Sequence, residues 1–415
     1  MDDSSRYIAR GLQGALEEAL KDTPVVCILG PRQSGKSTLA EKQAPNRTYI
    51  SLDDRNYLKT AQVDPIGFIA QLPDFVTIDE VQRVPELFLS IKRSVDANRR
   101  PGRFLLTGST NILQLPKLAD SLAGRMECLY LQPFTEVEKE RAPSLFLQRW
   151  LAGKLPRGLC GTRPLSRSTL PIRLVAGGYP EPCRRSASRA RQWHRQYLRS
   201  VTERDVRDVA QVKDVTDVSR LLELLAHRTA TLLNTSALAG ELRLDRLTVE
   251  RHLSILERLF LVRRLPAWHR NSAKRLVKAP KVHFVDSGLA ATLSALKSDD
   301  WNRHRSRFGH LLESFVTQQV IAQAGWTDPD LRFWHYRDKD KIEVDCVITR
   351  GSSVWGMEVK AAASVNDSDG KGLRRLAAQA GPDFQTGIVL YDGNEILPLD
   401  QPDLLAVPVS KLWEL

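Results

Sequence analysis

The chain has 415 residues, which at roughly 150 residues per domain predicts two or three domains. Apolar residues make up 42% and charged residues 27%, a mixture that excludes a disordered or fibrous chain. Lys and Arg number 61 against 49 Asp and Glu, and the resulting formal charge of +12 favours a polyanionic partner, either nucleic acid or an anionic membrane surface.

The five cysteines are scattered and form no CxxC pair, which argues against a disulfide framework and against a cysteine zinc site. No apolar stretch approaches the roughly 20 residues that a membrane helix needs. The first ten residues carry early acids and no apolar core, unlike a signal peptide. We therefore expect a cytoplasmic protein with no membrane partner.

Four short apolar runs alternate with helical segments in the first third of the chain. A helix is predicted over residues 8–20, and buried strands are predicted over residues 25–30, 75–79, 103–109 and 126–131. Strands that alternate with helices imply a parallel sheet. An α/β domain is therefore expected over roughly residues 20–135.

The motif GxxxxGK[ST] follows the first of these strands and precedes a helical segment, which is the context that a P-loop requires. Backbone N–H groups of such a loop wrap the phosphates, the lysine reaches the β- and γ-phosphates, and the serine hydroxyl binds Mg²⁺. The predicted ATP-binding residues are Gly30, Pro31, Arg32, Gln33, Ser34, Gly35, Lys36, Ser37 and Thr38.

The second strand ends in the acidic pair of a Walker B motif. Asp79 is expected to orient Mg²⁺ together with Ser37, and Glu80 to polarise the attacking water. On the next strand Ser109 is the candidate for orienting that water, with Thr107 and Asn111 as alternatives. The sequence contains neither NKxD nor LSGGQ, which favours ATP as the nucleotide.

Arg125 directly precedes the strand predicted at 126–131. In ring-forming ATPases an arginine at such a place reaches the nucleotide of the neighbouring subunit and stabilises charge in the transition state. A surface salt bridge is the competing interpretation.

The chain resembles the bacterial and archaeal AAA-type ATPases that carry a C-terminal domain of unknown function with a restriction-endonuclease-like appearance. The pieces that carry this resemblance span nearly the whole chain in order: GPRQSGKST, YISLDD, TIDEVQRVPELF, LLTGS, LAGR, GGYPEP, HFVDSGLAA and the EVDCVI and MEVK pair. The resemblance implies an AAA+ core, a winged-helix-like middle and an α/β C-terminal domain. The basic stretch 153–173, which we expect to be an exposed loop, departs from the usual short connection.

The middle of the chain is helical and basic. Residues 184–207 hold eight arginines, which indicate either a solvated helix face or a phosphate-contacting one. Residues 236–240 and 245–259 predict two helices followed by a strand, the layout of a helix-turn-helix with a wing. The expected core stripe is Leu247, Val249, Leu253, Leu256 and Leu259. The opposite side carries Arg246, Arg251 and His252, and the candidate DNA-binding residues are Arg246, Arg251, Arg263 and Arg264.

Beyond about residue 303 the pattern returns to mixed α/β, with carboxylates in the order of the PD-(D/E)xK nucleases. Glu313 lies in a predicted helix, Asp345 in a strand, and Glu358 and Lys360 on one face of a further strand. In such nucleases Asp345 and Glu358 would chelate Mg²⁺ and Lys360 would activate water. The alternative is a fold that kept its shape and its ion pairs without cleavage.

We therefore expect an AAA+ ATPase core at 1–150, a basic connection at 151–180, a helical, winged-helix-like domain at 181–300 and a nuclease-like α/β domain at 301–415. The first hypothesis is an ATP-driven enzyme, assembled as a homo-oligomer such as a ring, that processes or remodels DNA, branched DNA included. A second is a DNA-binding remodeller that does not cut. A third is a nucleotide-switched signalling or chaperone-like ATPase that acts on a protein.

Overall fold

The computed structural model describes residues 7–43, 47–111, 122–141, 145–156, 169–207, 215–271 and 278–415. They form two compact units. The first comprises Met1–Pro133 and Glu257–Phe260, and the second comprises Phe134–Leu256 and Leu261–Leu415.

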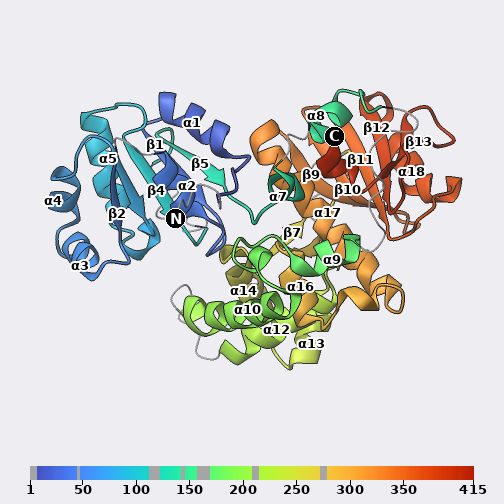
Figure 1. Cartoon of the computed structure of the whole chain (residues 1–415), viewed down its shortest axis with the longest axis horizontal. Coiled ribbons are helices and arrows are strands. Elements are labelled where there is room, and N and C mark those ends of the chain that lie inside the picture. The colour runs from blue at the N-terminus through green and yellow to red at the C-terminus, as the bar shows by residue number, and fades with distance from the viewer. Residues whose placement is uncertain are drawn as a thin grey trace. The chain divides into compact units, whose positions relative to one another are not determined.

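The first unit is built on a five-stranded parallel sheet with the strand order β2-β3-β4-β1-β5 (Figure 1). All four strands predicted from the sequence are confirmed, and β2 is added to them. The elements in chain order are α1 (Gln13–Asp22), β1 (Val25–Leu29), α2 (Lys36–Lys42), β2 (Thr48–Ser51), α3 (Arg55–Val63), α4 (Pro65–Ala70), β3 (Val76–Asp79), α5 (Leu87–Ala97), β4 (Phe104–Gly108) and β5 (Met126–Tyr130).

Apolar side chains are buried on both faces of this sheet. Along β1, Val25, Cys27 and Leu29 enter the core under α3, α4 and α5, whereas Val26 and Ile28 enter the core under α1 and α2. A strand that is buried on both faces reads as a continuous apolar run, which is why β1 could be predicted without alternation. The α/β fold expected for this part is confirmed.

The first unit ends at Pro133, ahead of the boundary expected at residue 150. Helices α7 (Glu136–Glu140) and α8 (Phe146–Leu151) belong to the second unit. The backbone N–H of Glu136 donates to the Gln319 side chain at 2.7 Å, and that of Leu145 donates to the Leu415 carbonyl at 2.9 Å. These partners are far away in sequence, so no local sequence pattern could predict the contacts.

Helices dominate the first half of the second unit, together with a small antiparallel sheet of order β6-β8-β7. The exposed loop expected over residues 153–173 does not extend to residue 173, because a helix begins at Thr169. Residues 157–168 of this stretch lie outside the described residues. The elements are α9 (Thr169–Ala176), α10 (Ala187–Ser200), α12 (Val215–His227), β6 (Thr231–Leu232), α13 (Thr235–Leu242), α14 (Arg246–Arg258), β7 (Val262–Leu265), β8 (Lys281–Phe284) and α16 (Ser287–Leu293).

The expected faces of α14 need two corrections. Val249, Leu253 and Leu256 are buried as predicted, but Leu247 is 60% exposed and His252 is only 6% exposed. Burial of the imidazole also lowers the pKa of His252. The helix therefore turns its His252 side, and not its Leu247 side, towards the core.

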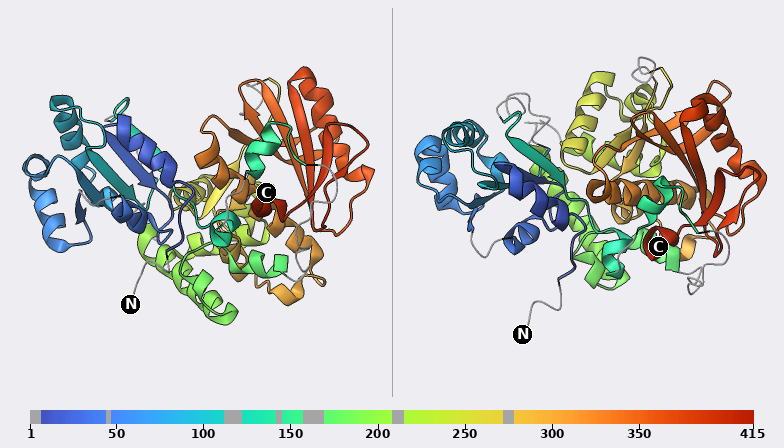
Figure 2. Two further views of the ribbon diagram at one scale, coloured as in Figure 1. Left: turned by 45° about the horizontal axis from the view of Figure 1, so that its top comes forward. Right: turned by 90° about the horizontal axis from the view of Figure 1, so that it is seen from above.

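The rest of the second unit is a six-stranded mixed sheet of order β13-β14-β12-β11-β10-β9. Strands β9, β10 and β11 are antiparallel neighbours, and β12 runs parallel to β11 after the helix α18. Helices α17 and α18 cover opposite faces of the sheet (Figures 1 and 2). The elements are α17 (Arg305–Thr327), β9 (Arg332–Arg337), β10 (Glu343–Arg350), β11 (Ser353–Lys360), α18 (Lys371–Ala380), β12 (Phe384–Tyr391), β13 (Leu397–Pro398), β14 (Leu404–Pro408) and α19 (Lys411–Glu414).

The sheets β6-β8-β7 and β13-β14-β12-β11-β10-β9 fall in one compact unit, which continues across the division expected at residue 300. Among the described helices, none has both the length and the apolar character that a membrane span needs.

Candidate functional site

The P-loop connects the buried strand β1 to the helix α2. A Cβ atom at Gly30 would lie 2.1 Å from the carbonyl oxygen of Leu131, so only glycine fits there. Gly35 has a φ of 96°, a left-handed conformation that glycine adopts without strain, and α2 begins at the next residue. The loop therefore ends at a helix N-terminus, which favours a bound phosphate.

Lys36 is the predicted phosphate-binding cation, and it is only 4% exposed. Its Nζ donates to the carbonyl oxygen of Pro31 at 2.9 Å, within the P-loop itself. Burial lowers the pKa of Lys36 to about 8, against the opposing influence of the nearby Glu80 and Asp79 carboxylates. Phosphate oxygens bound near Nζ would add negative charge beside Lys36 and would favour its charged ammonium form.

Arg10 holds the P-loop from the N-terminal side, a role that no pattern in the sequence indicates. It is 6% exposed, and its guanidinium donates to the Ser34 carbonyl at 2.7 Å and to the Gln132 carbonyl at 2.6 Å. One planar group thus joins the P-loop to the segment that follows β5.

A hydroxyl and a carboxylate meet where Mg²⁺ is expected. Ser37 Oγ donates to Asp79 Oδ1 at 3.0 Å, and Thr107 donates to the same oxygen. Asp79 also raises the pKa of Tyr49, after the larger effect of burial. Oxygen ligands of this kind suit Mg²⁺, which is usually held by few protein groups together with water and nucleotide phosphates. The residues predicted for this metal therefore fit it.

Glu80 carries a polar network around its carboxylate. Ser109 Oγ donates to Glu80 Oε2 at 2.8 Å, and Gln82 Nε2 donates to Ser109 Oγ at 3.0 Å and also to Glu80. The Glu80 N–H donates to Thr107 Oγ1 at 3.1 Å. The structure thus brings the predicted Ser109 to Glu80, places the alternative Thr107 against Asp79, and adds Gln82, which sequence reasoning missed.

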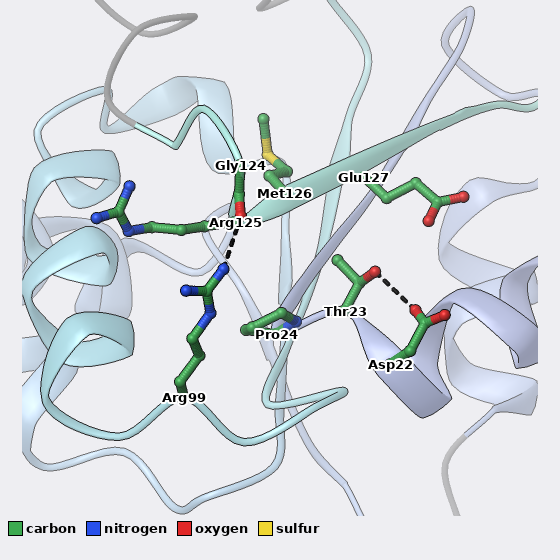
Figure 3. Close-up of a pocket in the computed structure, with 8 residues that line it drawn as sticks. All are labelled: Asp22, Thr23, Pro24, Arg99, Gly124, Arg125, Met126 and Glu127. Carbon is green, nitrogen blue, oxygen red and sulfur yellow. Dashed lines mark hydrogen bonds between the residues drawn. The ribbon is translucent and has the colours of Figure 1, made fainter.

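Arg125 lies at the edge of the sheet opposite to the P-loop. The P-loop follows the carboxyl end of β1, whereas Arg125 precedes the amino end of the parallel strand β5. Its Nε donates to Asp96 Oδ1 at 2.5 Å, and this contact lowers the pKa of Asp96. Arg125 lines an open pocket of about 460 Å³ with residues such as Arg99, which donates to the Gly124 carbonyl (Figure 3).

The predicted C-terminal residues also converge, although they come from three elements. Glu313 on α17, Asp345 on β10, and Glu358 and Lys360 on β11 line one pocket of about 560 Å³. Lys360 Nζ donates to Glu358 Oε1 at 2.9 Å, and the Val359 N–H donates to Asp345 Oδ2 at 2.9 Å. Burial, together with the nearby Asp345 carboxylate, raises the pKa of Glu358 to about 8, against the opposing influence of Lys360.

A lysine that sequence reasoning missed lies within this cluster. Lys281, the first residue of β8, is 3% exposed, and its Nζ lies 2.7 Å from Glu313 Oε1 and 3.0 Å from Asp345 Oδ1. Burial raises the pKa of the Glu313 carboxyl well above its usual range, with the nearby Asp345 adding to this effect and Lys281 opposing it. The one available signal is a lysine at the start of the short strand KVHF, which also contains the apolar Val282 and Phe284.

The residues present do not fit the Mg²⁺ predicted for Asp345 and Glu358. An ammonium group already contacts Glu313 and Asp345, and a second one contacts Glu358. Among the residues that the structure describes, no group of three His, Cys, Asp or Glu side chains could hold a metal ion.

Three family models match consecutive parts of the chain. An AAA domain matches residues 22–139, a domain of unknown function (DUF8612) matches residues 167–300, and another (DUF4143) matches residues 308–412. The chain carries an AAA-type P-loop ATPase domain. This ATPase domain contains the P-loop, Asp79, Glu80, Ser109 and Arg125.

Two mycobacterial proteins are similar to nearly the whole chain. The uncharacterized proteins Rv2008c of Mycobacterium tuberculosis and Mb2031c of Mycobacterium bovis are each 28% identical over 410 residues, which is 97% of this chain and 84% of the relative.

Solved structures resemble the chain more loosely. The Walker-type ATPase PABY2304 of Pyrococcus abyssi is 16% identical with a TM-score of 0.39, and the match covers 70% of this chain and 95% of the other. A RuvB variant of Thermotoga maritima is 20% identical with a TM-score of 0.30, over 64% of this chain and 94% of the other.

Proposed function

We propose that this chain is an ATP-hydrolysing DNA-binding protein that remodels DNA, and that its C-terminal domain does not cut the DNA. The observation that carries DNA binding is the pair of exposed arginines, Arg246 and Arg251, on α14. The net charge of +12 adds a field that attracts a polyanion.

The hydrolytic step is assigned to the network around Glu80. Lys36 and the P-loop N–H groups bind the phosphates, and Ser37 and Asp79 would hold Mg²⁺, which neutralises charge on the β- and γ-phosphates when it is bound. Glu80 accepts a proton from the attacking water. Ser109 and Gln82 fix the Glu80 carboxylate by hydrogen bonds to it.

The arrangement around α14 supports a winged helix. The chain runs through α12, β6, α13, α14, β7 and β8, and β8 lies between β6 and β7 in the small antiparallel sheet. In a helix-turn-helix the second helix enters the major groove with its N-terminal residues near the bases. Arg246 opens α14, the helix in that position.

The four candidate DNA-binding arginines differ in their exposure and in their ion pairs. Arg246 and Arg251 are exposed, and no ion pair joins either of them to a residue that the structure describes. Arg264 Nη1 instead lies 3.0 Å from Glu250 Oε2, and Arg263 is half-buried. The proposed contact with phosphates therefore rests on Arg246 and Arg251.

The C-terminal domain has the chain order of the PD-(D/E)xK nucleases. A helix, three antiparallel strands, a helix and a parallel strand follow one another in α17, β9, β10, β11, α18 and β12. Each carboxylate of the cluster that would bind the metal is paired with a lysine. We therefore favour a domain that kept the fold and contacts DNA without cleaving it.

The proposal is tested by fluorescence anisotropy with labelled linear, forked and four-way DNA over a series of salt concentrations. Each phosphate contact contributes about 0.9 to the slope of log affinity against log salt for duplex DNA. The double variant Arg246→Ala, Arg251→Ala should weaken binding and lower the slope by about two. A matched double variant on α3, Arg55→Ala with Lys59→Ala, removes two exposed charges and should leave the slope unchanged.

These titrations, together with a cleavage assay on the same DNAs, separate the competing functions. A wild-type protein that shows no salt-dependent binding to any of these DNAs would favour an ATPase that acts on a protein. Cleavage of DNA in the presence of Mg²⁺ or Mn²⁺ that is lost in Asp345→Asn would show that the C-terminal domain is a nuclease after all.

A further inference from the structure

We propose that Lys281 is a built-in cation that takes the place of a divalent metal in the C-terminal cluster. Its ammonium group lies between the carboxylates of Glu313 and Asp345, and Asp345 is one of the two residues that the sequence pattern assigns to a metal ion. This inference concerns metal occupancy alone and does not depend on whether Arg246 and Arg251 bind DNA.

The contacts of Lys281 are those of a bound cation. Its Nζ makes hydrogen bonds of 2.7 Å and 3.0 Å to two carboxylates from different elements, and Glu343 Oε2 lies 3.7 Å away. A buried ammonium group is costly unless it is paired and hydrogen-bonded, and here both carboxylates meet this condition. Glu313 and Asp345 are themselves 7% and 8% exposed, so the lysine supplies both buried carboxyl groups with a cationic hydrogen-bond donor.

The remaining carboxylate oxygens near Lys281 are mostly occupied as well. Asp345 Oδ2 accepts from the Val359 N–H, and Glu358 Oε1 accepts from Lys360. Glu358 Oε2 is buried without a hydrogen-bond partner among the described residues. A divalent ion needs several oxygen ligands at once, and hydrogen bonds already engage both Asp345 oxygens, Glu313 Oε1 and Glu358 Oε1.

Lys281 reaches the cluster from outside the sheet that carries Asp345 and Glu358. It begins β8, where it lies opposite Leu232 of β6 and Leu265 of β7 in the small antiparallel sheet. Because the ammonium group is tethered, it competes with a diffusing ion at a high effective concentration. A metal can enter only when the start of β8 moves away or when the lysine is replaced.

The test is Mn²⁺ binding to the full-length protein, followed by electron paramagnetic resonance and by the midpoint of thermal unfolding. All proteins carry Ser37→Ala and are free of nucleotide, so that the P-loop does not contribute a metal site. Four proteins are compared: this parent, the parent with Asp345→Asn, the parent with Lys281→Met, and the parent with both of the last two changes.

The parent and its Asp345→Asn variant should bind the same amount of Mn²⁺, because the Lys281 ammonium group excludes the ion from the cluster in both. Lys281→Met should gain one bound Mn²⁺ per chain and a Mn²⁺-dependent rise in its unfolding midpoint. Adding Asp345→Asn to Lys281→Met should abolish both gains. Circular dichroism checks that each variant is folded.

Two results would overturn the proposal. One is a parent that binds a Mn²⁺ ion which Asp345→Asn removes, and this comparison needs no change at Lys281. The other is a folded Lys281→Met variant that gains no Mn²⁺. If the methionine variant fails to fold, Lys281→Gln takes its place, because its amide is neutral and Mn²⁺ displaces it from the two carboxylates more readily than it displaces an ammonium group.

Discussion

At residue 80 the backbone has a φ of 58°, a left-handed conformation that side chains other than glycine rarely favour. The surrounding polar groups hold this conformation in place: the N–H donates to Thr107, and the carboxylate accepts from Ser109 and Gln82. Strained backbone that is fixed by its surroundings is typical of positions that must aim a catalytic group. Glu80 is thus aimed by residues of two adjacent segments before any substrate binds.

Replacing Glu80 by Gln keeps the shape of the side chain and removes its basicity. We expect ATP binding to persist and hydrolysis to fall by about 10²–10⁴-fold, the usual contribution of a positioned general base. Steady-state phosphate release together with nucleotide-binding titration measures both quantities. Glu86→Gln, which alters an exposed glutamate just beyond this segment, is the control and should hydrolyse ATP at the wild-type rate. Equal hydrolysis by wild type and Glu80→Gln would remove Glu80 from the mechanism.

The pKa of about 8 for Lys36 predicts how nucleotide affinity depends on pH. Below about pH 8 the free protein already carries the ammonium form that phosphates need. Above it the lysine loses its proton, so binding must take a proton up, and affinity should fall by up to about tenfold per pH unit.

Calorimetric titration of ATP near pH 8.5, in buffers of different ionisation enthalpy, should therefore detect net proton uptake. The exposed Lys42 lies on the same helix, and Lys42→Met should retain this uptake. Binding without proton exchange in the wild type would show that burial does not depress the pKa of Lys36.

Among the elements, helices α7 and α9 are joined by a buried charge. Glu136 on α7 is 1% exposed and pairs with Lys139 on the same helix and with Arg173 on α9. Arg173 also lies 2.5 Å from the more exposed Glu140. A carboxylate this deeply buried is tolerated because two cations accompany it.

Removing the buried partner should be costly. Glu136→Ala leaves Lys139 and Arg173 without their common carboxylate, and we expect it to lower the free energy of unfolding by about 3–5 kcal/mol. Glu140→Ala breaks a contact that water screens and should cost about 1 kcal/mol or less. Urea unfolding followed by circular dichroism compares the two variants. Similar losses in both would mean that the burial of Glu136 does not set its contribution.

The elements also differ in how well the sequence predicts them. The strands of the first unit and the residues of the P-loop were predictable because buried parallel strands and phosphate-binding loops leave local signatures. The roles of Arg10 and Lys281 were not, since each contacts groups that are distant in sequence. Leu247 is exposed, against expectation, because an apolar residue in a helical pattern need not face the core.

In the molecule as a whole, the position of Arg125 determines whether it could act on a nucleotide in its own chain or only on one in a second copy. It lies at the amino edge of the sheet, whereas the nucleotide is expected at the carboxyl edge, beside the P-loop. Arg125 thus serves hydrolysis only if a second copy of the chain brings it to a neighbouring nucleotide. Within one chain it pairs with Asp96.

Two substitutions distinguish an arginine finger from a surface ion pair. If Arg125 acts on a neighbour, Arg125→Ala should lower hydrolysis by about 10³-fold or more with little change in ATP affinity, and Asp96→Asn should not lower it. The measurement is hydrolysis against protein concentration, because a finger acts only in the assembled state. If Arg125 is an ion pair alone, both variants should hydrolyse ATP at the wild-type rate at every concentration.

Arg10 precedes the first helix and donates hydrogen bonds to the carbonyls of Ser34 and Gln132. The conformation of the P-loop therefore depends on whether the segment around Arg10 is docked against it. Release of that segment would free the P-loop to sample other shapes, and part of the binding energy of ATP would then go into ordering the loop. Conversely, a bound nucleotide would favour the docked segment by the same coupling free energy. Amide hydrogen exchange of residues near Arg10 should therefore slow when nucleotide is added, even though Arg10 touches backbone carbonyls and not phosphate.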